Sequence, residues 1–175
     1  AKASDMVMAF ANLMRYSIYY GSTIVPLQTD IEYINDYLLL QKMRYNRRLN
    51  YHIDIPEELM GCKIPKLLLQ PVVENSLVHG MKDIRSIAIN ISAWKEKGQL
   101  KLCVEDNGSG IREEKLEELR KGLEREDVYR EHIGLYNSHR VVRLLYGPES
   151  GMTIESSPGN GTKVTVTLPA DMEEI

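Results

Sequence analysis

The sequence predicts a two-layer α/β domain preceded by a pair of N-terminal helices. Apolar residues repeat with helical spacing up to about residue 46, and after that point they alternate with strand spacing in five short segments. Stretches of helical character separate these segments, and some neighbouring segments are joined by tight turns. Because helices interleave with antiparallel strand pairs, we expect helices to cover one face of a sheet.

The N-terminal segment is expected to contain two helices. Gly21 is a natural stop for the first, and after Pro26 the pair Thr29 and Glu32 forms a capping-box pattern that should begin the second, which runs to about Asn46. The spacing is typical of helices packed on one another, so the pair forms either a hairpin or dimerisation stalk, or a cover over a sheet. The expected seam residues are Met6, Phe10, Leu13, Ser17 and Tyr20 in the first helix, and Ile31, Ile34, Leu38 and Tyr45 in the second.

Strand patterns fill much of the remaining chain. The alternating segments are 51–55, 87–93, 100–104, 152–156 and 164–168. Lys97-Gly98 joins the second and third segments into a hairpin, and the turn at Pro158-Gly159-Asn160-Gly161 joins the last two.

Helical stretches lie between these strands. Pro65 is a favoured first helical residue, so a helix should run from about Lys66 to Gly80, with a kink or a later start at Pro71. A highly charged stretch covers 112–131. Another helix is expected from about Ile133 to Tyr146.

Composition narrows the classes of function. The 175 residues carry a formal net charge of -3, with charged residues at 27% of the chain, which leaves no basic stripe for a nucleic-acid partner. Cys62 and Cys103 form no Cys-x-x-Cys pair, which argues against a zinc site or a disulfide framework. No apolar run approaches the about 20 residues that span a bilayer. The chain begins within a helical pattern, which suggests a part of a longer protein.

One acidic residue has a position suited to the recognition of a base. Asp106 follows the strand over 100–104 and is itself followed by Gly108 and Gly110. A strand end holds a carboxylate rigidly, and glycines let the backbone pass close to a flat, polar ligand such as a purine. Asp-Asn-Gly is also a common turn between strands, so its meaning depends on other signals.

The helix that ends near Gly80 supplies a second signal. Asn75, Val78 and His79 share one of its faces, and Glu74 lies beside them. An asparagine or glutamate oxygen can hold Mg²⁺ while phosphates and water complete the coordination shell. The alternative is a solvated polar face, which is the better interpretation for Glu74 taken alone.

Two glycine-containing segments add to these signals. Gly134 lies near a helix start, where free N–H groups and the helix dipole can receive phosphate oxygens. Gly159-Asn160-Gly161-Thr162 brings backbone and a hydroxyl to the start of the last strand, although a simple hairpin turn would look the same.

In this order the four segments resemble the N, G1, G2 and G3 boxes of the ATP-binding domain shared by histidine kinases, gyrase, Hsp90 and MutL. The matching residues are Glu74-Asn75 with His79-Gly80, Asp106-x-Gly108-x-Gly110, Gly134-Leu135-x-Asn137 and Gly159-x-Gly161-Thr162. The resemblance implies the Bergerat or GHKL fold, which is an α/β sandwich with a mixed, mainly antiparallel sheet covered by helices.

Within that superfamily the chain resembles the LytS-like sensor histidine kinases of bacteria, which control autolysis and similar responses. The segments that carry this likeness are Leu13-x-Arg15-Tyr16-Ser17, Tyr33-Ile34-x-x-Tyr37-Leu38-x-x-Gln41-x-x-Arg44-Tyr45 and Leu69-Gln70-Pro71-Val72-Val73-Glu74-Asn75-Ser76-Leu77-Val78-His79-Gly80. The likeness covers nearly the whole chain. It implies that residues 1–48 are the remainder of a dimerisation and phosphoacceptor region, and that 49–175 form the ATP-binding catalytic domain.

The resemblance also implies roles for the matching residues. Asp106 would accept a hydrogen bond from the adenine amino group, and Asn75, with Glu74 as a further candidate, would hold Mg²⁺ against the phosphates. Glu74 is also the one candidate catalytic residue. The charged stretch 112–131 would be largely a mobile lid, or in part a solvated surface helix. The other residues expected to bind ATP are His79, Gly80, Gly108, Gly110, Ile111, Gly134, Leu135, Asn137, Gly161 and Thr162.

Three positions depart from the family pattern. His132 stands where glycine is usual, Val78 where a basic residue is common, and Val141 where an arginine is common. Arg140 and Arg143 are available to replace that arginine. We expect phosphate binding to be weaker than is typical of the family.

The phosphoacceptor histidine of the family lies in a Pro-His-Phe motif, and none of His52, His79, His132 and His139 has that setting. The chain is therefore expected to be the C-terminal, cytoplasmic part of a membrane-anchored sensor kinase that is homodimeric at full length. It would pass the γ-phosphoryl group of ATP to an upstream histidine, and from there to an aspartate of a response regulator. The alternatives are an ATP hydrolase, disfavoured because Pro71 stands where such enzymes need a glutamate, and a non-catalytic binding or dimerisation module.

Overall fold

The computed structural model describes residues 2–19, 21–81, 84–124 and 133–170. The helices are α1 (Lys2–Tyr19), α2 (Leu27–Tyr45), α3 (Gln70–Asn75), α4 (Glu113–Glu124) and α5 (Ile133–Tyr146), with the π-helical turn η3 (Ser76–Gly80) continuing α3. Two short 3-10 turns are η1 (Asn46–Arg48) and η2 (Glu57–Leu59). The strands are β1 (Ile24–Pro26), β2 (Leu49–Asp54), β3 (Lys63–Pro65), β4 (Ile87–Glu96), β5 (Gln99–Asp106), β6 (Gly151–Ser156) and β7 (Thr162–Pro169).

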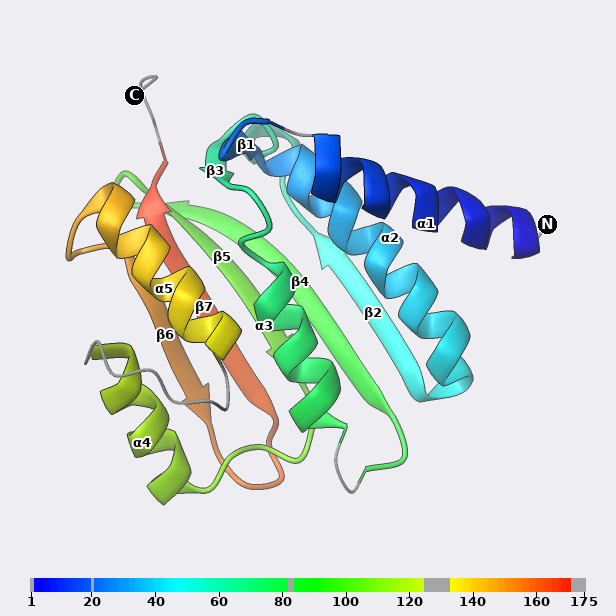
Figure 1. Ribbon diagram of the computed structural model, residues 1–175. Coiled ribbons are helices and arrows are strands. Elements are labelled where there is room, and N and C mark those ends of the chain that lie inside the picture. The colour runs from blue at the N-terminus through cyan, green and yellow to red at the C-terminus, as the bar shows by residue number, and fades with distance from the viewer. Residues whose placement is uncertain (1, 20, 82–83, 125–132, 171–175) are drawn as a thin grey trace.

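The main sheet has five strands in the order β2-β4-β5-β7-β6. Strand β2 runs parallel to β4, and all other neighbours are antiparallel. Helices α2, α3 and α5 lie in front of one face of this sheet, with α1 outside α2 (Figure 1). The predicted two-layer α/β fold with a mixed, mainly antiparallel sheet is confirmed.

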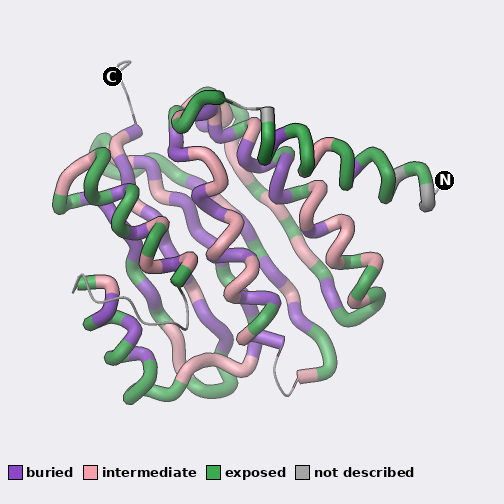
Figure 2. The backbone as a smooth tube through the Cα atoms, viewed as in Figure 1, coloured by how far each residue is buried: buried purple, intermediate pink, exposed green. Residues whose placement is uncertain are grey.

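Strand alternation places the core between the sheet and the helices. Ile89, Ile91 and Leu102 are at most 1% exposed, whereas Asn90 and Glu105 on the opposite face are exposed. Figure 2 shows this as buried strands beneath the helical layer. Each such aliphatic side chain contributes about 1.5–3 kcal/mol when it is fully buried, so this face of the sheet stabilises the fold and fixes the strand register.

The first predicted hairpin is confirmed. Strands β4 and β5 pair from Ile89 opposite Asp106 to Glu96 opposite Gln99, which leaves two residues in the turn. Lys97 has φ 50° and Gly98 has φ 77°. A left-handed conformation at both positions is the turn that matches the natural twist of paired strands.

The N-terminal helices form a hairpin, and its second helix also covers the sheet. Helix α1 packs on α2, while α2 packs on β2. The predicted inward face of α2 is confirmed, because Ile31, Ile34 and Leu38 are all buried.

The predicted seam of α1 is wrong at Met6, Phe10 and Ser17. Met6 and Phe10 are 44% and 59% exposed, and Ser17 is exposed as well, whereas Ala9 and Tyr16 are buried. Ala9 and Tyr16 therefore lie on the inward face of α1, and Met6, Phe10 and Ser17 face outward. Leu13 packs against the core as expected, and Tyr20 lies outside the described residues.

The predicted capping box at Thr29 is also wrong. Helix α2 begins at Leu27, three residues earlier than a cap at Thr29 implies, and no side chain caps it. The N–H of Leu27 donates to the carbonyl of Cys62 at 2.8 Å, and that of Gln28 donates to Met60 at 2.9 Å. Backbone carbonyls from another segment therefore satisfy the free N–H groups that a capping side chain would serve.

Pro65 is not the first residue of a helix, contrary to the prediction. It ends β3, which pairs with β1 in a small two-stranded sheet that the sequence pattern did not reveal. Strands of three residues carry almost no periodic signal. The later of the two expected helix starts is confirmed, since α3 begins at Gln70 with Pro71 in its first turn.

The charged stretch is helical where it is described. Helix α4 buries Leu116 and Leu119 and packs on β6, with its charged residues exposed. This part therefore matches the expected surface helix. Residues 125–132, on which the rest of the lid prediction falls, lie outside the described residues.

Candidate functional site

Asp106 lies at the centre of the candidate site. It ends β5, is 3% exposed, and is paired in register with Thr162 at the start of β7. Its Oδ1 accepts hydrogen bonds from the N–H of Gly108 at 2.8 Å and of Thr162 at 3.3 Å. Its Oδ2 is buried and has no hydrogen-bond partner among the described residues. One carboxylate oxygen therefore holds the loop together, and the other is left to accept a bond.

Burial controls the electrostatics of this carboxyl group. Desolvation raises the pKa of Asp106, while the Ser76 hydroxyl and the N–H groups of Gly108 and Thr162 offset part of that rise, and the charge of Glu105 adds to it. A buried acceptor without a partner is unfavourable in the free protein. A ligand that brings an N–H donor to Oδ2 would relieve this cost.

Glycines allow the backbone to close around Asp106. A Cβ on Gly108 would lie 2.5 Å from the Cα and the carbonyl oxygen of Gly80, and a Cβ on Gly80 would lie 2.8 Å from the Cδ1 of Ile87. Gly161 has φ 72°, and a Cβ there would lie 1.8 Å from the carbonyl oxygen of Asp106. Close packing against backbone atoms requires glycine at Gly108 and Gly161, whereas at Gly80 the nearest atom is the tip of a side chain. The same packing positions the carboxylate.

Gly110 and Ile111 connect this loop to the last hairpin. Gly110 has φ 68°, and a Cβ on it would lie 1.9 Å from the carbonyl oxygen of Ser157. The N–H of Ile111 donates to the Ser156 hydroxyl at 2.9 Å, and that hydroxyl lies 3.0 Å from the hydroxyl of Thr162. The structure thus brings the second and fourth predicted motifs together.

The first motif adjoins them through η3. The Ser109 N–H donates to the carbonyl of Gly80 at 3.0 Å, and the Ser109 hydroxyl donates to the carbonyl of His79 at 3.3 Å. His79 and Asn75 are half-buried. Glu74 accepts a hydrogen bond from Gln70 at 2.8 Å, so its carboxylate is held along α3.

The third motif, on α5, is joined to α3. A Cβ on Gly134 would lie 2.9 Å from the Cβ of Pro71, so glycine here permits close approach of the two helices. Leu135 is 2% exposed and belongs to the core, whereas Asn137 is exposed. Among the three, only Asn137 presents an exposed polar side chain, and no described contact joins it to Asp106.

The histidines differ in environment. His52 is exposed on β2, and His132 lies outside the described residues. His139 is 8% exposed, and its Nδ1 accepts a hydrogen bond from the N–H of Met152 at 2.9 Å. Burial lowers the pKa of His139, and the nearby charge of Arg143 lowers it further. His139 therefore joins α5 to β6 as a structural residue.

A divalent cation at this site would need ligands from the nucleotide. The described residues contain no group of three or more His, Cys, Asp or Glu side chains placed to hold a metal ion. Asn75 and Glu74 can provide one or two oxygens, and Mg²⁺ sites commonly take the rest from phosphates and water. The residue types present fit a nucleotide-bound Mg²⁺.

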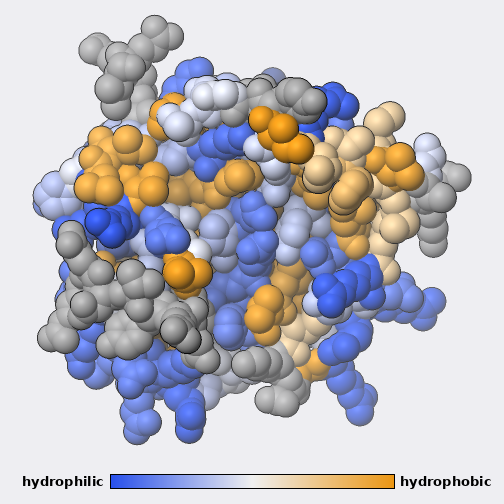
Figure 3. Space-filling model, viewed as in Figure 1, coloured by the Kyte–Doolittle hydropathy of each residue, from blue (hydrophilic) through white to orange (hydrophobic). Residues whose placement is uncertain are grey.

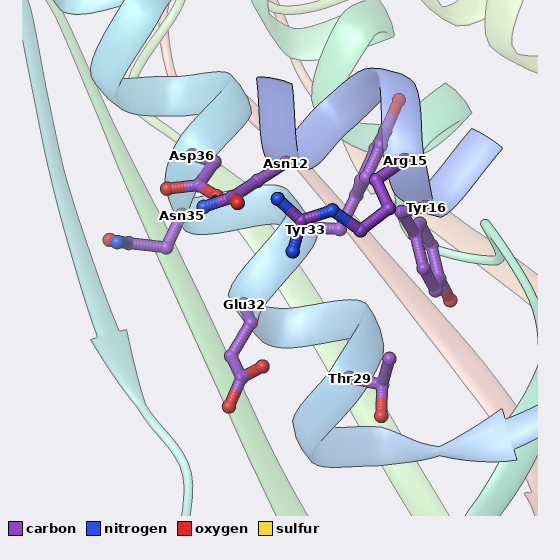
Figure 4. A pocket seen from close by; sticks show the side chains of 8 residues that line it. All are labelled: Asn12, Arg15, Tyr16, Thr29, Glu32, Tyr33, Asn35 and Asp36. Atoms are coloured by element: carbon purple, nitrogen blue, oxygen red, sulfur yellow. Dashed lines mark hydrogen bonds between the residues drawn. The ribbon is translucent and has the colours of Figure 1, made fainter. Parts of the chain in front are cut away.

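Two hollows lie elsewhere on the molecule. One, of about 390 Å³, lies between α1 and α2, where Asn12, Tyr16 and Asp36 are among its lining residues (Figure 4). The other, of about 620 Å³, is bounded by α4, α5 and β6, with Arg120 and His139 in its lining. Neither contains a predicted site residue.

Sequence reasoning missed two hydroxyl residues of the site. Ser76 lies near the Asp106 carboxylate. The Ser156 hydroxyl contacts Gly161, Thr162 and the N–H of Ile111. Ser76 directly follows Asn75, which was predicted to be a site residue, so the sequence already placed Ser76 near the site. No sequence pattern marked Ser156, because its role arises from the pairing of β6 with β7.

Comparison with known families agrees with this geometry. The family described as "Histidine kinase-, DNA gyrase B-, and HSP90-like ATPase" matches residues 63–172, and the family described as "Histidine kinase" matches residues 1–49. The first match covers more than half of the chain. The chain therefore belongs to the histidine kinase-, DNA gyrase B- and HSP90-like ATPases.

Similar proteins of known name are sensor histidine kinases. The chain is 34% identical to the sensor histidine kinase YesM of Bacillus subtilis, over 98% of this chain and 28% of the relative. It is 30% identical to the sensor protein kinase HptS of Staphylococcus aureus, over 95% of this chain and 32% of the relative. The chain thus spans about a third or less of the length of these relatives.

Solved structures share the fold. The histidine kinase domain of the blue-light activated kinase from Erythrobacter litoralis EL346 superposes with a TM-score of 0.60 at 20% identity, covering 97% of this chain and 75% of that one. The catalytic domain of the histidine kinase ThkA gives a TM-score of 0.65 at 15% identity, covering 86% and 98%. None of the described helices has the length and apolar character needed to cross a membrane.

Proposed function

We propose that this chain is the ATP-binding catalytic part of a two-component sensor histidine kinase. Residues 49–175 form its catalytic domain, because β2 begins at Leu49 and joins the same sheet as the site. Residues 1–48 belong to the dimerisation and phosphoacceptor region. The family membership and the sensor kinases among the relatives support this division.

The observation that carries the proposal is the buried, unpartnered Oδ2 of Asp106. An adenine amino group supplies the N–H donor that this oxygen lacks. Gly80 and Gly108 keep Cβ atoms away from the carboxylate, Gly161 keeps one away from the Asp106 backbone carbonyl, and Thr162 flanks the carboxylate. Guanine carries a carbonyl oxygen where adenine carries the amino group, so it would place two acceptors against one another. The site is therefore selective for adenine.

The phosphate end uses residues of α3 and α5. Asn75, with Glu74 as a second candidate, holds Mg²⁺ through its side-chain oxygen, and His79 lies toward the sugar or the phosphates. Asn137 and the N–H groups around Gly134 face the phosphates at the start of α5. Bound Mg²⁺ neutralises charge on the transferring phosphoryl group.

The reaction is an in-line transfer. A nitrogen of an imidazole outside this chain attacks the γ-phosphorus, a P–N bond forms, the bond to the β–γ bridging oxygen breaks, and ADP leaves while the imidazole loses its proton. The residues of this chain bind and orient ATP and stabilise the equatorial oxygens. An aspartate of a response regulator then receives the phosphoryl group.

Incubation with γ-labelled ATP tests this assignment. We expect the chain to bind ATP with Mg²⁺ and to remain unlabelled, since no histidine here has the acceptor setting. Supply of a fragment that carries the acceptor helix should give an acid-labile, base-stable label on that fragment. Label of this kind on the chain itself would contradict the missing acceptor, and steady release of phosphate would favour a hydrolase.

The full-length protein is proposed to be a homodimer anchored in the cell membrane, with this part on the cytoplasmic side where ATP and the response regulator are found. Apolar side chains gather on the surface over α1 (Figure 3). Six of them are 44% to 70% exposed, namely Met6, Val7, Met8, Phe10, Met14 and Ile18. Burial of this surface against a second copy is expected to hold the dimer. Sedimentation tests this, because Phe10→Ser should weaken the association of two copies.

A further inference from the structure

A buried carboxylate on α2 lies away from the nucleotide site. Asp30 is 0% exposed and belongs to the inward face of α2, beside Ile31 and Ile34. An acid is rarely placed there, because a buried charge is costly unless hydrogen bonds stabilise it. Burial raises the pKa of Asp30, and the hydrogen bonds that it accepts counter this rise.

The donors to Asp30 come from the turn that leads into α3. The N–H of Leu67 donates to Oδ1 at 2.7 Å, and the N–H of Leu69 donates to Oδ2 at 3.3 Å. Leu67 has φ 60°, a conformation that leucine seldom adopts without outside support. Asp30 therefore holds the turn that determines where Gln70, the first residue of α3, begins.

A third donor links the same carboxylate to α1. The Tyr16 hydroxyl donates to Oδ1 of Asp30 at 3.0 Å, and the Tyr16 ring lies 5.0 Å from the ring of Tyr33. The Tyr33 hydroxyl donates to Gln70 at 3.0 Å, and Gln70 donates to Glu74 at 2.8 Å. Two routes of contact therefore lead from α1 and α2 to α3. One passes through Asp30 to the turn before α3, and the other passes through Tyr33 and Gln70 to Glu74, the neighbour of Asn75.

We infer that Asp30 is a positioning residue that sets the place of α3, and with it Asn75, according to where α1 lies. The inference rests on the proposed function, since it concerns how the phosphate end of that site is held. A carboxylate suits this role because its two oxygens receive donors from two different elements at once. At the adenine end, Asp106 lies on β5 and accepts hydrogen bonds from Gly108 and from Thr162 of β7, and no described contact joins it to Asp30.

Calorimetric titration with Mg-ATP and with adenosine tests the inference on the 175-residue chain. Asp30→Asn turns one acceptor oxygen into a donor that faces a backbone N–H, and Tyr16→Phe removes the hydroxyl that joins Asp30 to α1. For both variants we expect Mg-ATP affinity to fall by about five- to tenfold while adenosine affinity is unchanged. Hydrogen exchange at the Leu69 amide should quicken in Asp30→Asn.

Asn12→Ala is the matched control, because Asn12 donates to Asp36 at 3.0 Å and so joins α1 to α2 without contact to α3 (Figure 4). It should leave both affinities unchanged. If Asn12→Ala weakens Mg-ATP binding as much as Tyr16→Phe does, or if Asp30→Asn weakens adenosine and Mg-ATP equally, the inference is wrong and Asp30 only stabilises the helical pair. If the unaltered chain binds neither ligand, the proposed function fails and the inference with it.

Discussion

The adenine end and the phosphate end of the proposed site are built in different ways. At the adenine end, Asp106 and Thr162 are buried and joined by a hydrogen bond from the Thr162 N–H to the Asp106 carboxylate, and Gly108 and Gly161 beside them leave no room for a Cβ. At the phosphate end, Asn75 and His79 are half-buried and Asn137 is exposed. The proposed base recognition thus relies on the packing of the fold, whereas the proposed phosphate recognition relies on a few accessible side chains.

This difference separates stability from binding. Substitutions of the glycines that pack around Asp106 should change the free energy of unfolding together with nucleotide affinity, because they displace the backbone that holds the carboxylate. Substitution of Asn75 should lower Mg-ATP affinity without loss of adenosine affinity. The predictions below test that separation.

The largest effect is expected at Gly161. Gly161→Ala forces a Cβ to within 1.8 Å of the Asp106 carbonyl oxygen at φ 72°, so the free energy of unfolding should fall by about 2–4 kcal/mol in chemical denaturation. Gly98→Ala is the control, because Gly98 has φ 77° with nothing within 4 Å, and about 1 kcal/mol is expected there. Equal losses would show that φ strain, and not close packing around Asp106, is what matters.

Asp106→Asn should weaken ATP binding by about 10- to 100-fold, since a hydrogen bond to a charged group contributes about 1.5–3 kcal/mol. The amide oxygen can still receive the N–H groups of Gly108 and Thr162, so the free energy of unfolding should be unchanged or higher. Glu105→Gln, on the exposed face of the same strand, should alter neither quantity. Calorimetry measures ATP affinity, and thermal unfolding measures stability. Undiminished ATP affinity in Asp106→Asn would contradict the role assigned to Asp106.

Asn75→Ala is expected to reduce Mg-ATP affinity by about tenfold, equivalent to about 1.4 kcal/mol. Adenosine affinity should stay the same, because the Asp106 carboxylate is held by hydrogen bonds that do not involve Asn75. Asn90→Ala on the open face of the sheet provides a matched control. A parallel loss of adenosine binding would mean that the two ends are not separable.

Gly134→Ala should cost about 1 kcal/mol of unfolding free energy, because its Cβ would lie 2.9 Å from the Cβ of Pro71 and the two helices must shift slightly. Leu144→Ala on the same helix removes a side chain that is 75% exposed and should change stability by less than about 0.5 kcal/mol. If Gly134→Ala stabilises the protein, helix propensity outweighs the contact between α3 and α5.

The smallest effect concerns pH. Because burial raises the pKa of Asp106 above its ordinary value of 3.8, the folded protein holds this proton more tightly than the unfolded chain. The contribution to stability is present below pH 3.8 and is lost as pH rises through the raised pKa. The unfolding free energy of the unaltered protein minus that of Asp106→Asn should therefore fall with rising pH across that window. A difference that rises instead would contradict the desolvation of Asp106.

Sequence periodicity was sufficient for the large elements. Strands β4 and β5, their turn at Lys97-Gly98, and α5 agree with prediction because each carries a long apolar repeat or a strongly signalled turn. Strands β1 and β3 were missed because three residues give no repeat. The start of α2 was misplaced because carbonyls of Met60 and Cys62, distant in sequence, supply its cap.

In the site, too, local patterns were predicted and contacts between distant segments were missed. Asp106 and its glycines could be predicted because backbone constraints restrict residue types within one short segment. The hydrogen bonds of Ser156 and Asp30 depend on the approach of segments far apart in the chain. A local pattern does not encode such contacts, although an acid on the apolar face of α2 was a visible irregularity.

Titration of the unaltered chain with ATP and with GTP, each with Mg²⁺, tests the central claim most directly. If the free Oδ2 of Asp106 receives the adenine amino group, ATP should bind at least about tenfold more tightly than GTP. Equal affinities for the two nucleotides would contradict the account.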